Sequence, residues 1–346
     1  MKTNPLLKVV LVIFLFYSPA HGQESIKFDS ISIEEGLSQS LVTSILQDNK
    51  GFLWFGTADG LNKFDGYTFE IFRHDDKDPD SIDNNWVTTI FEDASGIIWV
   101  GTKEGLNRFN AANKTFTHFL PRDAESEIFQ WRGIKSIAED NQGYLWIGTF
   151  NEGIFRFDRS RTNFLQYIHS ENDPDSISSN NISRITQDNS GELWILTYSN
   201  VMNRYNEEND SFEHLSLNDE NVKSVAQILD YDESTYFVGS DIGLIKIRKN
   251  TGEQETIASG IQGQNTLPSV LITDMVVDAA GNIWISTRNG LARFDIKTET
   301  ISSYEYDPDD PFSLSVNNLN DLFIDRSGIL WIATNGLGVS YYSTQI

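Results

Sequence analysis

Two of the eight tryptophans in the sequence have neighbours that suit ligand binding. Trp86 follows Asn85, and Trp131 precedes Arg132. An indole offers a flat apolar face for stacking, and a guanidinium supplies directed hydrogen bonds to anionic groups. This combination suits a sugar ring that carries hydroxyl or acidic substituents. Four further residues, each at the variable position of a recurring turn, extend the candidate set: Lys103, Phe150, Tyr198 and Arg288.

The sequence contains none of the motifs that mark familiar catalytic or cofactor sites. There is no P-loop, no Gly-x-Ser-x-Gly turn and no His-Glu-x-x-His pair. Cysteine is absent, which excludes thiolate catalysis, cysteine-zinc sites and disulfides. Four histidines fall on or just after outer strands of different repeats and cannot converge on one metal: His74, His118, His169 and His214. We therefore predict no catalytic residue, no metal and no cofactor, and a protein that is not an enzyme.

Acidic residues are abundant, but their spacing favours turns over chemistry. A glycosidase needs two carboxylates about 5–10 Å apart around a cleft, and no pair of Asp or Glu residues stands out. Three loops contain Pro-Asp turns and lack the alternating ligand spacing of a dedicated calcium loop, so we interpret them as structural. They are Asp78-Pro-Asp80-Ser81, Asp173-Pro-Asp175-Ser176 and Asp307-Pro-Asp309.

The candidate residues are carried by a repeat. Asp48-Asn-Lys-Gly51-Phe-Leu-Trp54-Phe-Gly56-Thr57 returns five times, with tryptophans at Trp54, Trp99, Trp146, Trp194, Trp284 and Trp331. The gap between Trp194 and Trp284 is twice the usual spacing, and Tyr236-Phe237-Val-Gly239-Ser240 fills it with Phe237 in place of tryptophan. Seven copies follow, and we expect the repeated rings to pack between neighbouring units.

Each copy is predicted to form four strands. In the first copy, short runs rich in β-branched and aromatic residues cover 42–47, 52–57, 61–64 and 67–72, separated by Gly, Asp or Asn. The fourth copy has Asn200 where other copies have a turn glycine, which predicts a positive φ at that position. Four-stranded repeats of about 45 residues indicate an all-β fold, a β-propeller of radial blades.

The two ends of the sequence decide the domain organisation. The seventh copy has three strands, and residues 25–33 supply the missing outer strand, so the N-terminal strand closes the ring in the last blade. We predict a seven-bladed propeller over residues 23–346. Residues 1–22 join Lys2 and Lys8 to an apolar run and a small-x-small site, which indicates a cleavable signal peptide and a periplasmic location. No later segment has the apolar length of a membrane span, so we predict none in the mature chain.

Charge further limits the partners. The formal net charge is −24, with acidic residues spread along the whole chain. Such a surface repels phosphate backbones, so we predict no nucleic-acid partner.

Propeller geometry predicts where the candidate residues meet. The loops that lead into the inner strands share one face with the turns between the second and third strands. We therefore expect a ligand-binding site at the mouth of the central channel, formed by Asn85, Trp86, Lys103, Trp131, Arg132, Phe150, Tyr198 and Arg288. The alternative for Trp86 and Trp131 is that each ring simply covers the adjacent blade.

The repeat resembles a known family. Gly36-Leu37-Ser38-Gln39, followed by Asp48-x-x-Gly51-x-x-Trp54-x-Gly56-Thr57-x-x-Gly60-Leu61-Asn62-Lys63-Phe64-Asp65, strongly resembles the two-component regulator propeller repeat, over essentially all of 24–346. The resemblance implies the periplasmic sensor region of a bacterial hybrid histidine kinase, whose propeller binds a ligand, often a carbohydrate fragment. Such proteins usually continue into a second propeller, an immunoglobulin-like domain, a membrane helix and kinase domains. This sequence stops after one propeller, so no kinase role is carried over to any residue.

The function expected from the sequence is a periplasmic sensor propeller of two-component signal transduction, stand-alone or truncated from a hybrid histidine kinase. Its expected partners are an oligosaccharide or other small ligand, and a membrane sensor kinase or second propeller. Two alternatives stay open. A propeller polysaccharide lyase or glycoside hydrolase would release product from an acidic glycan, and a protein-interaction scaffold would bind a partner protein without binding glycans.

Overall fold

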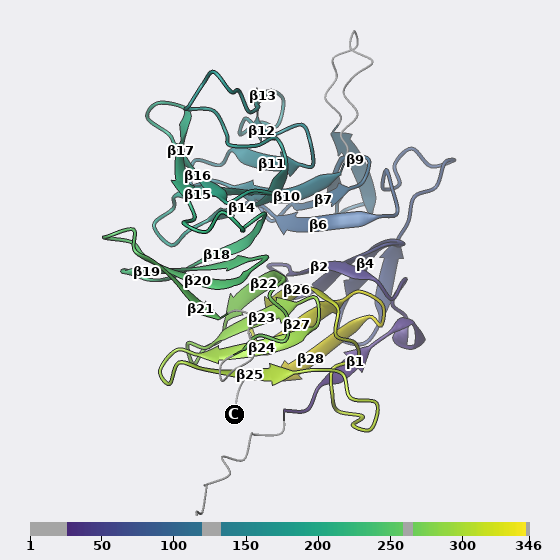
Figure 1. Ribbon diagram of the computed structural model, residues 1–346. Helices are drawn as coiled ribbons and strands as arrows, with labels where there is room; N and C mark the ends of the chain where they lie inside the picture. The colour runs from purple at the N-terminus through teal and green to yellow at the C-terminus, as the bar shows by residue number, and fades with distance from the viewer. Residues whose placement is uncertain (1–25, 120–132, 259–265, 344–346) are drawn as a thin grey trace, which may run out of the picture.

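The computed structural model of the chain describes residues 26–119, 133–258 and 266–343. They fold into seven four-stranded antiparallel sheets arranged in a ring, the seven-bladed β-propeller that the repeat predicts (Figure 1). The first strands of the blades contact one another in a closed ring around the central channel. The described part of the chain includes no helix with the length and apolarity that a membrane crossing requires.

The two inner strands of each blade carry most of the core. The innermost strands, from blade 1 to blade 7, are β2 (Val42–Gln47), β6 (Val87–Glu92), β10 (Ile134–Glu139), β14 (Ile182–Gln187), β18 (Val225–Asp232), β22 (Ile272–Val277) and β26 (Leu319–Ile324). The second strands are β3 (Leu53–Thr57), β7 (Ile98–Thr102), β11 (Leu145–Thr149), β15 (Leu193–Thr197), β19 (Thr235–Ser240), β23 (Ile283–Thr287) and β27 (Ile329–Thr334). Almost every residue of the second strands is buried, because both faces of this strand pack against neighbouring blades.

The outer half of each blade is more exposed. The third strands are β4 (Gly60–Phe64), β8 (Leu106–Asn110), β12 (Ile154–Phe157), β16 (Val201–Asn206), β20 (Gly243–Arg248), β24 (Gly290–Asp295) and β28 (Val339–Ser343). The outermost strands are β5 (Phe69–Phe72), β9 (Thr115–Phe119), β13 (Phe164–Tyr167), β17 (Ser211–Ser216), β21 (Gln254–Ala258), β25 (Thr300–Tyr304) and, in blade 7, β1 (Asp29–Ile31). One 3-10 turn, η1 (Ile33–Glu35), leads from β1 towards blade 1.

The N-terminal strand closes the ring as predicted. Strand β1 pairs antiparallel with β28, with Asp29 opposite Tyr341 and Ile31 opposite Val339. Figure 1 shows this purple strand beside the yellow C-terminal strands. Phe28 is 4% exposed and packs into the core cluster between blades 6 and 7. Closure therefore combines strand pairing with burial of an aromatic side chain.

The repeated Asp and Trp form one structural unit. In six blades the tryptophan Nε1 donates to the second oxygen of the aspartate six residues earlier, at 2.7 to 3.0 Å. The first oxygen accepts backbone N–H groups of the turn, as Asp48 does from Lys50 and Phe52. The six rings are at most 5% exposed. The prediction that these rings pack between blades is confirmed.

Two positions of the repeat behave differently from the sequence pattern. In blade 5, Phe237 takes the tryptophan place, and Tyr236 instead donates its hydroxyl to Asp188 of blade 4 at 3.0 Å. In blade 4, Asn200 is not among the described non-glycine residues with positive φ, so that prediction is wrong. The turn is one residue longer: Met202 pairs where Leu61 pairs in blade 1, so Val201 occupies the place of Gly60.

The acidic loops and histidines have structural roles. In the loops before blades 2 and 4, Ser81 and Ser176 accept the backbone N–H of Asp75 and Ser170. His74 and His169 donate from Nδ1 to carbonyl oxygens of these loops at 2.8 Å. His118 and His214 donate to the carbonyl oxygens of Ser81 and Ser176 from the neighbouring outer strands. The Pro-Asp segments therefore hold the loops that lead into the inner strands.

Candidate functional site

One face of the propeller gathers its least regular side chains around the channel. On this face, two segments of each blade lie together: the turn between the second and third strands, and the loop that leads into the inner strand. The first residue of the turn donates its N–H to the carbonyl of the last loop residue. The pairs are Ala58 with Leu41, Lys103 with Trp86, Tyr198 with Asn181, Asp241 with Ser224, Arg288 with Leu271 and Asn335 with Asn318, at 2.8 to 3.2 Å. These bonds hold the variable turn residues next to the variable loop residues around the channel. We call this region the channel mouth.

Trp86 and Lys103 form the blade 2 part of the mouth. The Lys103 Nζ lies 3.3 Å from the centroid of the Trp86 ring, which makes a close cation–π contact. Lys103 is exposed and Trp86 is partly exposed. The indole is therefore accessible at its rim, with a cation already placed on one face.

Phe150, Tyr198 and Arg288 continue the mouth through blades 3, 4 and 6. The rings of Phe150 and Tyr198 meet edge to face, with centroids 6.1 Å apart, and are 42% and 45% exposed. Tyr198 and Arg288 line one cavity of about 250 Å³, together with Arg184 and Asp241. Pockets of roughly this size can enclose part of a small ligand. Tyr198 and Arg288, predicted from the sequence, thus share a cavity.

Within the described part of the chain, the cations Lys103 and Arg288 at the mouth lack carboxylate partners. Arg288 donates from one nitrogen to the side-chain oxygens of Asn318 and Asn320, at 3.2 and 2.9 Å. These acceptors are neutral, so the guanidinium charge is not balanced by them. Among the described residues, neither Lys103 nor Arg288 forms an ion pair.

The remaining predicted site residues stand apart. Asn85 accepts the N–H of His74 with its side-chain oxygen at 2.7 Å, and Asn180 and Asn317 do the same for His169 and Tyr306. This repeated bond gives Asn85 a structural task in its loop, and its role in ligand binding stays a prediction. Trp131, Arg132 and residues 1–22, predicted to be a signal peptide, lie outside the described residues.

The sequence analysis missed a group of charged residues inside the channel. Blades 4, 6 and 7 place Arg184, Asp274 and Asp321 at the third residue of their inner strands, which surround the channel. Arg184 pairs with Asp274 at 3.0 Å, while Asp274 also accepts the N–H of Leu322 at 3.1 Å. Asp321 accepts the N–H of Ile45 at 2.8 Å and so joins blade 7 to blade 1. Burial, and then the Asp274 carboxylate, raise the pKa of Asp321 well above its ordinary value.

These residues could have been found from the repeat itself. Aligned by strand, the third residues are Ser44, Thr89, Ser136, Arg184, Gln227, Asp274 and Asp321. The second residue of β10 is Lys135, whose Nζ lies 5.3 Å from the Phe150 ring centroid. The signal in both cases is a charge at a position that other blades fill with a neutral residue.

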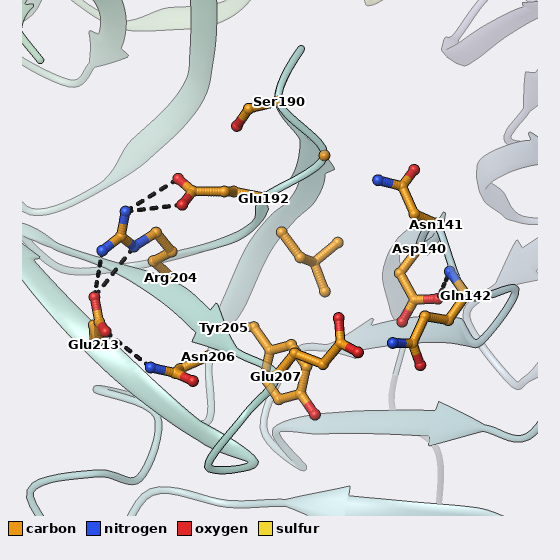
Figure 2. A pocket seen from close by; sticks show the side chains of 12 residues that line it. Asp140, Asn141, Gln142, Ser190, Glu192, Arg204, Tyr205, Asn206, Glu207 and Glu213 are labelled. Carbon is orange, nitrogen blue, oxygen red and sulfur yellow. Dashed lines mark hydrogen bonds and ion pairs between the residues drawn. The ribbon is translucent and has the colours of Figure 1, made fainter.

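A second pocket, of about 410 Å³, lies between blades 3 and 4 near the Asp–Trp turns. Figure 2 shows Arg204 between Glu192 and Glu213, with Asp140 and Glu207 nearby. Arg204 pairs with Glu192 at 3.0 Å and also with Glu213. The charges of this pocket are therefore largely satisfied within the protein, in contrast to those of the mouth.

Comparison with known proteins assigns the repeat. The two component regulator propeller model matches residues 36–59, 81–104, 130–151, 176–199, 266–289 and 313–336. The unmatched interval between 199 and 266 contains blade 5, whose turn lacks both the Asp and the Trp of the other copies.

Three relatives illustrate the range of similarity. Histidine kinase P4 of Formosa agariphila is 45% identical over 82 residues, which are 24% of this chain and 6% of that protein. The extracellular domain of BT3049 from B. thetaiotaomicron, described as a hybrid two component system, is 25% identical with a TM-score of 0.76, covering 92% of this chain and 42% of that one. Virginiamycin B lyase from Staphylococcus aureus, at 13% identity and a TM-score of 0.68, covers 92% and 99% and shares the fold alone. The chain thus spans less than half the length of the first two relatives.

Proposed function

The chain carries two component regulator propeller repeats, and on that premise we propose that it is the ligand-binding sensor propeller of a two-component signalling system. Its ligand is an oligosaccharide bound at the channel mouth. Binding is passed to a membrane sensor kinase or to a second propeller. The kinase match and the extracellular domain of a hybrid two component system support the signalling part of this proposal.

The observation that carries the ligand class is the alternation of aromatic rings and cations along the mouth. Lys103 lies over Trp86, Lys135 lies near Phe150, and Phe150 contacts Tyr198, which shares a cavity with Arg288. Aromatic faces bind the apolar faces of sugar rings, and neighbouring donors bind their oxygen substituents. A mouth of this composition fits a sugar chain better than it fits a purely apolar ligand.

The proposed location is the periplasm, after removal of residues 1–22. Mass spectrometry of the exported chain is expected to find Gln23 or a close neighbour at the N-terminus. An intact Met1 on cytosolic protein would contradict the proposed location.

The ligand proposal is tested by calorimetric titration of the full chain with a panel of neutral and acidic oligosaccharides. For a sugar that binds the parent, Phe150→Ala and Tyr198→Ala are each expected to weaken binding about tenfold, because stacking contributes about 1 kcal/mol or more. Tyr67→Ala is the control, since this ring is 92% exposed in the β4–β5 turn.

The same experiment separates the alternatives. Unchanged binding by both folded mouth variants places the ligand elsewhere. Release of product from the sugar indicates a lyase or hydrolase, and a failure of the whole panel to bind favours the protein-interaction scaffold.

A further inference from the structure

The second residue of every inner strand lies at a β-bulge. In all seven blades the register between the first and second strands shifts at this residue, which marks a β-bulge. Six blades have a neutral residue there: Thr43, Thr88, Ser183, Ala226, Thr273 and Asn320. Blade 3 has Lys135. Four of these residues, Ser183, Ala226, Thr273 and Asn320, line the mouth cavity that also contains Tyr198 and Arg288, so this position borders the channel mouth.

Three of the six neutral bulge residues join neighbouring blades. Thr43 donates to the carbonyl of Val87 at 2.8 Å, Ser183 to that of Val225 at 2.7 Å and Asn320 to that of Val42 at 2.7 Å. Each bond joins one blade to the first inner-strand residue of the next. Among the described residues, Lys135 forms no hydrogen bond or ion pair, and its Nζ lies 5.3 Å from the centroid of the Phe150 ring. Within the described part of the chain, Lys135 thus makes no bond of this kind to the next blade.

The environment of Lys135 is unfavourable for a charge. The side chain is partly buried, and burial, together with repulsion from Lys103, lowers the pKa of the Lys135 ammonium. Burying a charge without a partner costs free energy. The chain has 50 acidic and 26 basic residues, so acidic partners are not scarce. Among the described residues no carboxylate pairs with this cation, and an anionic group of a ligand would supply the missing opposite charge.

We propose that the ammonium of Lys135 binds an anionic group, a carboxylate or a sulfate, of the ligand held at the channel mouth. This inference rests on the proposed function and names the ligand class as an acidic oligosaccharide. Phe150 presents a ring beside the ammonium, and Lys103 adds a second positive charge. A sugar ring stacked on Phe150 places its anionic substituent next to Lys135. An anion there also relieves the repulsion between the two lysines.

The test uses a substitution that restores the residue type of the other blades. Lys135→Thr places threonine where blades 1, 2 and 6 have it, so we expect the variant to melt at or above the temperature of the parent. Lys135→Arg keeps the charge, and Lys297→Thr removes an exposed lysine from the β24–β25 turn as a matched control. The probes are trigalacturonate, a sulfated disaccharide, and methyl-esterified trigalacturonate as the uncharged counterpart.

We expect calorimetry to show that an anionic probe binds the parent and Lys297→Thr alike, and binds Lys135→Thr at least tenfold more weakly. Lys135→Arg should retain most of the affinity, because the charge-assisted hydrogen bond is kept. The methyl ester should not distinguish the parent from Lys135→Thr. In the parent, the anionic probe should also slow acetylation of Lys135. This rate is measured by mass spectrometry of the peptide that contains Lys135.

Equal binding of the anionic probes to the parent and to Lys135→Thr overturns the inference. Failure of both anionic probes to bind the parent or to protect Lys135 overturns it as well. A neutral sugar whose binding depends on Phe150 and Tyr198 but not on Lys135 would leave the sensor function standing and remove only the acidic ligand class.

Discussion

The Asp–Trp turns and the channel mouth lie at opposite ends of the same inner strands, and the blades resemble one another at only one of these ends. Six turns repeat the bond from Trp Nε1 to the aspartate. At the mouth, the first residue of the turn between the second and third strands differs in every blade: Ala58, Lys103, Phe150, Tyr198, Asp241, Arg288 and Asn335. Every blade must pack against its neighbour, so a packing contact recurs around the ring. A ligand contact need occur only once.

Charge pairing shows the same difference. Arg204, near the Asp–Trp turns, pairs with two glutamates of its own blade. At the mouth, the described hydrogen bonds of the Arg288 side chain go to neutral amides, and Lys135 has no hydrogen-bond or ion-pair partner among the described residues. Stability therefore resides in the repeated contacts, and binding capacity in the irregular ones.

Deleting residues 23–33 is expected to have the largest effect on stability. The deletion removes β1 together with Phe28 and Ile31, which are 4% and 8% exposed, and leaves β28 with an open edge. Loss of a buried phenylalanine alone costs about 3–5 kcal/mol. We expect a much lower melting temperature by calorimetry and association by sedimentation. Deletion of 23–25 alone is the control. A variant without 23–33 that stays monomeric and equally stable would contradict ring closure by β1.

Trp99→Ala tests the repeated turn in a single blade. Trp99 is 1% exposed and donates to Asp93 at 2.8 Å. Its removal creates a cavity and leaves a buried carboxylate oxygen without its donor, so we expect a loss of about 3–5 kcal/mol in the free energy of unfolding, measured with denaturant. Trp99→Phe is expected to lose less, because blade 5 accommodates Phe237 at the same position. Equal losses in the two variants would show that ring burial is not the main contribution.

The fold was predictable because it depends on the residues that recur. The Asp-x-x-Gly-x-x-Trp spacing shows the number of blades, even though blade 5 lacks both the Asp and the Trp. The missing strand of blade 7 could be paired with the N-terminal segment because an open ring leaves an unpaired edge. The error at Asn200 arose from a one-residue difference in turn length, which alternating strand patterns do not register until the pairing of Met202 is known.

The site was only partly predictable. Tyr198 and Arg288 were found because they vary at an easily aligned turn, and the structure places them in one cavity. Lys135, Arg184, Asp274 and Asp321 lie within strands, where side-chain direction depends on the bulge. Their spacing in sequence does not show that Arg184 of blade 4 reaches Asp274 of blade 6. Such a contact across the channel depends on the curvature of the ring.

The Asp321 carboxyl, which joins blade 7 to blade 1, is expected to make stability depend on pH. Since the pKa of Asp321 is raised in the folded state, that state holds the proton more tightly than the unfolded chain, whose carboxyl pKa is about 3.9. Stability should therefore fall as pH rises from about 4 through the folded pKa, by about 1.4 kcal/mol for each unit of upward shift. Asp321→Asn cannot ionise and still accepts the Ile45 N–H.

The measurement is the free energy of unfolding of the parent and of Asp321→Asn between pH 4 and 8. We expect the free energy of unfolding of Asp321→Asn, relative to that of the parent, to increase as pH rises. Asp309→Asn changes a residue in an exposed loop, and its curve should follow that of the parent. Parallel curves for the parent and Asp321→Asn would show that the carboxyl ionises as freely in the folded state as in the unfolded chain.

Trp86→Ala is expected to have the smallest effect on stability, and it tests the comparison most directly, because Trp86 and Trp99 belong to the same blade. Trp86 is partly exposed, and its described ring contact is with the Lys103 ammonium, a cation–π interaction that contributes about 0.5–1 kcal/mol at an exposed site. Surface substitutions usually change stability by about 0.5 kcal/mol or less, so we expect a loss below about 1 kcal/mol in denaturant unfolding. Lys103→Ala should reproduce most of that loss if the cation is the main partner of the ring. A loss of 2 kcal/mol or more in Trp86→Ala alone would instead mean that the indole covers the neighbouring blade, and Trp86 would then belong with the packing residues and not with the mouth.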